Sequence, residues 1–285
     1  MTAPIIIYTR FSLINKNFHP GSWRIGRDQN FDDYVKSIIG DEGRLRDRCN
    51  IFELSAQNIN AASEIEQIRH LVYASDALPS WVKNRLNTWS ETYKWMTIRY
   101  LSFEEDASVN RDLIRAIASL CKDLRLSGRI NYASVRLDDD DILSPKYFQH
   151  LSKYTSENFS GYCISFSSGY CAIWNGAEAV LQKFHHTRLP FNAQGLAYVG
   201  NYDIERGSVS SAHVLPPGTH TTVDLRAPTI VDGREPLYVR SVHPNSDTLF
   251  GLPDDKKRQA LERIVGTGTP ATREEIERTF VGLCV

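Results

Sequence analysis

The sequence lacks a long hydrophobic run, which limits how the chain can meet a membrane. Near the start of the 285 residues, the longest clean apolar run is the three isoleucines at 5–7. A membrane-spanning helix needs about 20 apolar residues, and the core of a signal peptide about 7 to 15. We therefore expect a cytoplasmic protein with no transmembrane segment, for which peripheral membrane association stays open.

Cysteine is sparse and follows no pairing pattern. The five cysteines form no C-x-x-C pair and no grouping typical of zinc, and an odd number fits poorly with a full disulfide framework. Reduced thiols are the favoured interpretation. Cys163 and Cys171 share one strand parity, so they could still face each other across a hairpin.

Charge of one sign is not in excess. Lysine and arginine total 33 against 34 aspartates and glutamates, and the formal net charge is −1. This balance creates no overall field for nucleic acid, and we expect no nucleic-acid partner. Hydrophobic residues make up 41% and charged residues 24%, which excludes a disordered chain. No internal repeat and no long Pro-, Gly- or Ser-rich linker divides the sequence, so one domain is expected.

The first half of the chain alternates strand-like runs with amphipathic helices. Strands are expected at 5–8, 68–74, 95–101 and 130–137. Helices are expected at 44–59, 79–89, 109–120 and directly after Ser144 and Pro145. The alternation predicts right-handed crossovers and an α/β fold with a central, mainly parallel sheet. Ligands of such sheets gather at the carboxyl ends of the strands.

Beyond residue 159 the pattern becomes α+β. We expect a hairpin over 161–174, a helix from Asn175 through Phe184, and a second hairpin over 229–242. The chain then returns to helix from Asp254. A capping box formed by Thr272 and Glu275 predicts one more short helix.

Four consecutive aspartates, Asp138 to Asp141, follow the fourth predicted strand. Packed carboxylates repel and raise one another's pKa, so they need a compensating cation or full solvation. Magnesium or manganese is held by one or two carboxylates, with water and substrate phosphates completing the shell. The placement predicts a metal-diphosphate site. A solvated acidic turn that caps the next helix is the alternative, and position alone does not decide between them.

Several segments, in chain order, resemble a bacterial family of rhamnosyltransferases of the GT-A type. They are Thr9-Arg10-Phe11-Ser12, Arg44-Leu45 through Gln57, Tyr73-Ala74-Ser75-Asp76 with Leu78-Pro79, Arg136-Leu137-Asp138-Asp139-Asp140-Asp141, and Tyr238-Val239-Arg240-Ser241-Val242-His243 with Asn245. The resemblance implies a single GT-A-like domain over 1–285. Its nucleotide-sugar-binding half would be 1–158, its acceptor-side half 159–252, and its C-terminal helices 253–285.

The resemblance also implies a site for a nucleotide-diphosphate sugar and Mn²⁺ or Mg²⁺. The implied metal ligands are Asp138, Asp140, Asp141 and His243. The implied donor-binding residues are Thr9, Arg10, Asp76, Arg136, Asp138 and Asp139. Structural alternatives remain for several of them: a surface ion pair for Arg10, a helix cap for Asp76 and a structural histidine for His243.

The implied reaction is metal-dependent transfer of the sugar to a glycan, a lipid-linked or another hydroxyl acceptor, as in surface polysaccharide synthesis. An inverting enzyme needs a general base. Asp203, Glu205 and His213 are candidates because their segments could line an acceptor cleft, although each could be structural and a retaining enzyme could use none of them. Metal-dependent hydrolysis of a sugar nucleotide or phosphoester, and a non-catalytic carbohydrate-binding module, remain the alternative functions.

Overall fold

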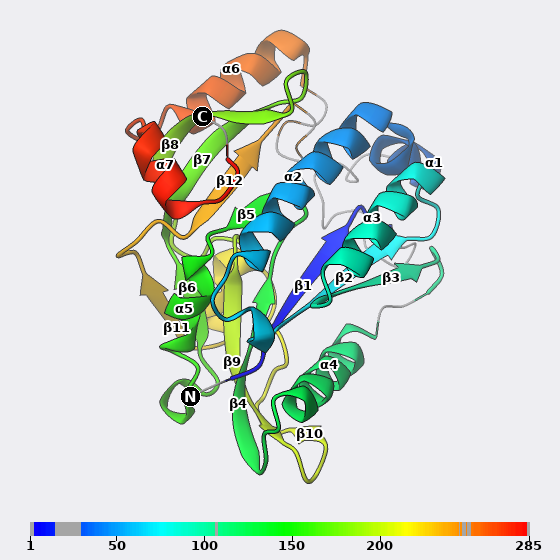
Figure 1. Cartoon of the computed structure of the whole chain (residues 1–285). Coiled ribbons are helices and arrows are strands. Elements are labelled where there is room, and N and C mark those ends of the chain that lie inside the picture. The colour runs from blue at the N-terminus through cyan, green and yellow to red at the C-terminus, as the bar shows by residue number, and fades with distance from the viewer. Residues whose placement is uncertain are drawn as a thin grey trace.

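The computed structural model describes residues 3–14, 30–105, 108–244, 246, 249 and 252–283. A large sheet lies at the centre of the molecule (Figure 1). It has eight strands in the order β11-β6-β9-β4-β1-β2-β3, with β10 paired to β9. The bounds of these strands are β1 (Ile5–Phe11), β2 (Ile68–Ser75), β3 (Met96–Leu101), β4 (Arg129–Arg136), β6 (Cys163–Phe166), β9 (Leu196–Asp203), β10 (Ser208–Val209) and β11 (Thr229–Asp232).

The four strands predicted in the first half form one parallel block of this sheet. β1 pairs in parallel with both β2 and β4, and β2 pairs in parallel with β3. β11 is parallel to β6, whereas β9 runs antiparallel to β4 and β6. The predicted α/β class with a mainly parallel central sheet is confirmed.

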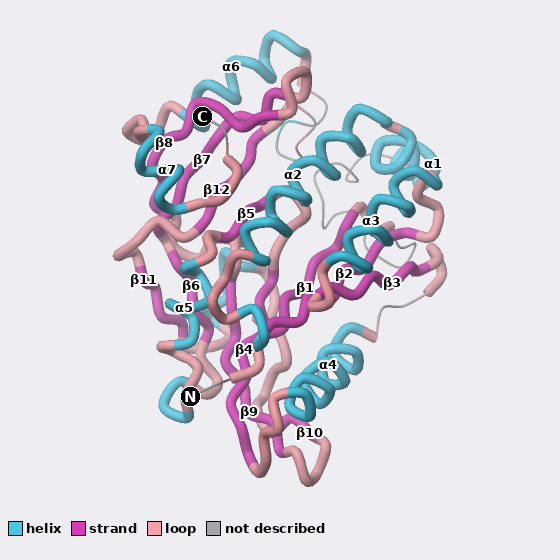
Figure 2. Tube along the Cα trace, in the orientation of Figure 1, coloured by secondary structure: helices cyan, strands magenta, loops and turns pink. Residues whose placement is uncertain are grey.

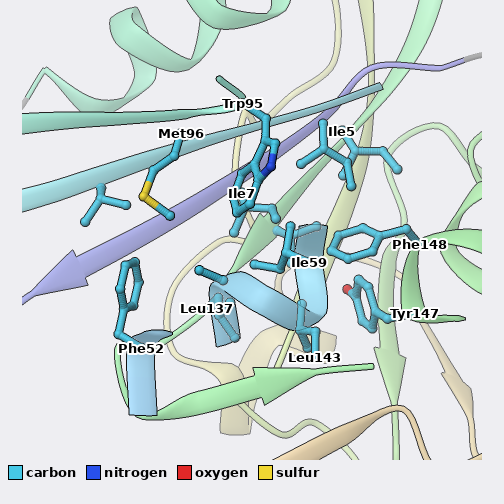
Figure 3. Close-up of a cluster of buried hydrophobic side chains, with 14 of the residues drawn as sticks. Ile5, Ile7, Phe52, Ile59, Trp95, Met96, Leu137, Leu143, Tyr147 and Phe148 are labelled. Carbon is cyan, nitrogen blue, oxygen red and sulfur yellow. The ribbon is translucent and has the colours of Figure 1, made fainter. Parts of the chain in front are cut away.

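Helices cover both faces of the parallel block because alternate β1 residues point to opposite sides. Ile5 and Ile7 pack with α2 (Glu42–Asn60) and α3 (Ser80–Thr92), as Figure 3 shows around Phe52 and Ile59. Ile6 packs instead with α4 (Val109–Asp123). The other helices of the first half are α1 (Phe31–Val35), the π-helix Lys36–Gly40 and α5 (Lys146–Ser152). No helix in the described ranges is both long and apolar enough to cross a bilayer.

A second sheet of four strands packs beside the first (Figure 2). Its order is β5 (Asp141–Leu143), β12 (Tyr238–Val242), β7 (Ser168–Asn175) and β8 (Val180–Arg188). One face packs on α7 (Arg273–Thr279), and the other packs on α6 (Asp254–Val265). Thr272 and Glu275 form the predicted capping box, so the C-terminal helices are confirmed.

The predicted hairpin over 161–174 is wrong. β6 and β7 are separated by Ser167 alone, and they belong to different sheets. The backbone N–H of Ser167 donates to Asp232 O at 2.8 Å, which holds the point where the chain passes from one sheet to the other. Cys163 and Cys171 are therefore on separate sheets, and both are buried free thiols.

The helix expected from Asn175 to Phe184 is also wrong, since the chain turns at Asn175 and returns as β8 antiparallel to β7. Likewise, 229–242 is no hairpin: β11 pairs with β6, whereas β12 pairs with β5 and β7. The short strand β5 occupies a position where no strand was expected. It brings the end of the aspartate run directly against β12.

Candidate functional site

A cleft of about 830 Å³ opens where β1 and β4 end, at their carboxyl edge. Its lining comes from the end of β1, from α1 and α2, from the aspartate run, from the loops at 189–194 and 218–221, and from β12. Gly218 adopts a φ of +73°, and a Cβ there would meet the Arg226 side chain at 2.6 Å. Glycine therefore allows the second loop to turn tightly into the cleft.

Arg48, on α2, links the two central aspartates. Its Nη1 donates to Asp139 Oδ1 at 3.0 Å and also contacts Asp140 Oδ2. The other oxygen of Asp139 accepts the backbone N–H of Ser12 at 3.1 Å. Asp139 is buried at the wall of the cleft, where its carboxylate ties the end of β4 to β1 and α2. Arg44, one helical turn before Arg48, donates to Ser12 Oγ at 3.1 Å.

The same contacts separate the pKa values of the two aspartates. Burial raises the pKa of Asp139, and the attraction of Arg48 only partly offsets this. Burial acts on Asp140 as well, but there the opposing contacts, chiefly those with Arg48, outweigh it and hold the pKa below its usual value. Asp140 is therefore ionised at neutral pH and supplies negative charge to the cleft.

The outer aspartates differ in exposure. The Asp138 side chain is 31% exposed and lies 3.3 Å from Arg136 Nη2. Asp141 is buried in β5, where its Oδ2 accepts a hydrogen bond from Gln194 Nε2 at 3.0 Å. Burial raises the pKa of Asp141, and the charges of Asp140 and Asp138 raise it further. Asp138 and Asp140 are thus the carboxylates best placed to meet a ligand.

His243 follows β12 and is fully buried. Its Nε2 lies 3.5 Å from Asp140 Oδ2, which is too long for a good hydrogen bond. Neither ring nitrogen has a hydrogen-bond partner among the described residues. Burial, together with Arg48, lowers the pKa of His243, so the imidazole is neutral and can offer a lone pair. A buried unpartnered imidazole beside an ionised carboxylate is a pair of donors that a divalent metal would satisfy.

The donor set can be compared with what Mg²⁺ or Mn²⁺ requires. Among the described side chains, no three from His, Cys, Asp and Glu converge as a metal cluster, so the four predicted ligands do not meet as one set. These metals commonly take few protein ligands, and substrate phosphates and water supply the others. Asp140 and His243, 3.5 Å apart, fit such a metal as a pair. Asp141, which already accepts from Gln194, is the least available of the four.

The predicted donor-binding residues divide into two groups. Arg10 and Arg136 line the cleft with Asp138 and Asp139. Asp76 is exposed where β2 ends and is absent from the described lining. Asn245, part of the resemblance, lies outside the described residues.

Thr9 points into the core instead of the cleft. Its Oγ1 donates to Leu137 O at 2.8 Å and lies 2.8 Å from His70 Nε2. Because the hydroxyl proton is already used, His70 must donate through Nε2–H, and its buried Nδ1 has no partner among the described residues. Thr9 therefore joins β1 to β4 and β2, and its implied role in donor binding lacks support from its placement.

Burial lowers the pKa of His70 to about 3. The unfolded chain, with a histidine pKa of about 6.5, takes up this proton first, so stability falls as pH drops below about 6.5. We expect His70→Gln, which keeps a donor for Thr9 but cannot titrate, to lose about 2 kcal/mol less stability than the wild type between pH 7 and pH 5. Urea unfolding at the two pH values measures this. An equal loss in both proteins would contradict the assignment.

The three predicted general bases lie away from the described lining of the cleft. Because β9 is antiparallel to β4, Asp203 pairs with Arg129 and sits at the opposite end of the sheet from the aspartate run. Glu205 follows in the same exposed turn. The His213 ring packs edge-on against Tyr198 at 5.8 Å. Their catalytic roles remain predictions without support from their positions.

Sequence reasoning missed several residues of the cleft, among them Arg48, Gln194, His220 and Arg240. A signal existed for Arg48, because Arg44 and Arg48 are spaced i, i+4 on the helix that also carries the apolar residues Leu45 and Cys49. Arginines beside that apolar face indicate a buried ion pair. Gln194 lies in a loop and His220 begins a short 3-10 helix. Neither belongs to a periodic apolar pattern, so the sequence gives no signal that they line a cleft.

The chain resembles solved structures and matches one family model. No curated protein is found to match the sequence. One similar structure is the mannosyltransferase PcManGT from Pyrobaculum calidifontis in complex with GDP-Man and Mn²⁺, with a TM-score of 0.42 and 11% identity over 84% of this chain and 57% of that one. Another is a "Putative Glucose-1-Phosphate Thymidylyltransferase" from Bacillus anthracis in complex with a sucrose, with a TM-score of 0.30 and 9% identity over 92% and 95% of the two chains.

This chain thus spans little more than half of the mannosyltransferase structure, and with both TM-scores below 0.5 neither likeness carries a functional argument. The family model is more informative, because it matches residues 5–250 and so covers most of the chain, including the aspartate run and His243. The chain belongs to the glycosyltransferase family described as "Putative rhamnosyl transferase".

Proposed function

We propose that this protein transfers a sugar from a nucleotide-diphosphate donor to a hydroxyl acceptor, with Mn²⁺ or Mg²⁺ bound at Asp140 and His243. The observation that carries the proposal is the unpartnered His243 imidazole, 3.5 Å from the ionised carboxylate of Asp140. The pair lies beside a cleft at the carboxyl edge of the parallel strands, where ligands of α/β sheets bind. Membership of the family supports the class of reaction.

Four side chains in or beside the cleft would have distinct roles in this reaction. Asp140 and His243 would hold the metal, which when bound would offset the charge that develops on the leaving diphosphate. Arg48 keeps Asp140 ionised and fixes its position through Asp139. Asp138, partly exposed beside Arg136, would face the donor at the same edge. The acceptor, a glycan or lipid-linked hydroxyl, would enter from the open side of the cleft.

Donor consumption tests the proposal directly. The purified protein is incubated with dTDP-rhamnose, GDP-mannose or UDP-glucose and a mixture of octyl glycosides, with MnCl₂ or with EDTA. We expect release of nucleoside diphosphate from at least one donor, and we expect acceptor and Mn²⁺ to increase it. If no donor is consumed and no nucleoside diphosphate shifts the melting temperature, the proposal fails. Rapid donor cleavage that acceptor does not change would instead indicate a hydrolase.

A further inference from the structure

The charges that line the cleft do not cancel pairwise. Five arginines and four aspartates contribute to the described lining: Arg10, Arg44, Arg48, Arg136, Arg240, Asp138, Asp139, Asp140 and Asp141. Arg48 satisfies the two central aspartates. Asp141 accepts from an uncharged amide. Among the described residues, none of the four aspartates forms an ion pair with Arg240.

Arg240 is the clearest case. It lies on β12, where its backbone pairs with Asp141, and its side chain reaches the cleft. In the described part of the chain its guanidinium has no hydrogen bond and no ion pair. Arg136 is only loosely held, because its contacts with Asp138 measure 3.3 to 3.5 Å. Among the described residues, the whole Arg240 guanidinium and Nη1 of Arg136 thus have no hydrogen-bond partner beside the aspartate run.

Arg136, Arg240 and His220 line the same cleft. Burial lowers the pKa of His220, which lies on the 218–221 loop, and the charges of Arg136 and Arg240 lower it further. Both guanidinium groups are therefore within electrostatic reach of the same imidazole. The pKa of Arg10 is lowered by burial and additionally by Arg136. Like charges that line the same cleft repel one another, and an anion bound between them would relieve this repulsion.

We infer that Arg136 and Arg240 bind the diphosphate of the donor directly, so that its binding does not depend on the metal. The identity of the donor rests on the proposed function. Arg136 precedes Asp138 by two residues and Arg240 is paired with Asp141, so an anion that bridges these arginines lies next to Asp140. A diphosphate offers several anionic oxygens to these arginines, and the guanidinium fork matches the geometry of phosphate oxygens.

Isothermal titration with inorganic pyrophosphate in excess EDTA tests this inference. We expect the wild type to bind pyrophosphate without a metal. Arg240→Gln should weaken binding roughly tenfold or more, since charge-assisted hydrogen bonds are lost. Arg240→Lys keeps the charge but not the fork, so its affinity for pyrophosphate should lie between those of the wild type and Arg240→Gln. Arg115→Gln is the matched control, because Arg115 lies on α4 outside the described cleft lining and is 71% exposed.

Pyrophosphate binding that requires Mn²⁺ in the wild type, or that is equal in the wild type and Arg240→Gln, would overturn the inference. Arg136→Gln gives an independent test if Arg240→Gln fails to fold, as judged by circular dichroism. The two proposals fail in different ways. Retained metal-free pyrophosphate binding without consumption of any sugar nucleotide would reject only the proposed function. Donor consumption without metal-free pyrophosphate binding would reject only the arginine site.

Discussion

Replacing Asp140 by asparagine is expected to reduce donor turnover roughly a hundredfold or more. The amide keeps the shape of the side chain but removes the negative charge that faces His243 and a bound metal. The fold should survive, because Arg48 keeps its ion pair with Asp139 at 3.0 Å. Steady-state release of nucleoside diphosphate and the thermal melting temperature measure the two effects separately.

Asp123→Asn is a suitable control for this variant. Asp123, the last residue of α4, is 52% exposed and pairs with Arg69 on β2, outside the described cleft lining, so its loss should leave turnover near the wild-type level. Pyrophosphate binding in EDTA should also persist in Asp140→Asn, since the arginines remain. Unchanged turnover in a folded Asp140→Asn protein would contradict the role given to this carboxylate.

Replacing Arg48 by methionine is expected to have the largest effect on stability. Methionine retains most of the buried volume but leaves Asp139 and Asp140 without their shared cation. Removal of one partner from a buried ion pair costs about 3 to 5 kcal/mol, because the remaining charge stays desolvated. Only 6% of the Arg48 side chain is exposed, so solvent screens little of this loss. Urea unfolding at pH 7 gives the difference in free energy.

Arg46→Met provides the comparison on the same helix. The Arg46 side chain is 67% exposed and pairs with Glu42 one turn away, an arrangement worth about 0.5 kcal/mol or less. Arg48→Lys should recover part of the stability, since it restores one positive charge without the fork. Equal stability of Arg48→Met and Arg46→Met would show that the aspartates do not depend on Arg48.

Local sequence patterns predicted the main strands and helices of the first half of the fold, but not α1 or the π-helix Lys36–Gly40. β1 to β4 and α2 to α4 each show a clear periodic spacing of apolar residues. The aspartate run follows the end of β4, as the apolar pattern of that strand predicts. The second half depends on pairings between distant segments. Ser167 passes the chain between sheets, and β5 has only three residues, so neither feature has a local signal. Their positions become defined only when β12 packs between β5 and β7.

The candidate site shows the same division. Asp138 and Asp140 were predicted from consecutive carboxylates, and His243 from the resemblance. Sequence reasoning also predicted a compensating metal or full solvation for these carboxylates, and it did not consider an arginine. In the structure, Arg48 on α2 supplies part of the compensating positive charge. Arg48 lies 91 residues before Asp139 in the chain. A long-range ion pair of this kind cannot be read from spacing along the sequence.

The central claim is that Asp140 and His243 hold a metal together with the donor diphosphate. Anomalous diffraction at the manganese edge tests it most directly, on crystals soaked with Mn²⁺ and UDP, GDP or dTDP. We expect one manganese peak about 2 Å from an Asp140 oxygen, from His243 Nε2 and from diphosphate oxygens. A nucleotide bound in the cleft with manganese at neither residue, or manganese bound only elsewhere, would contradict the account.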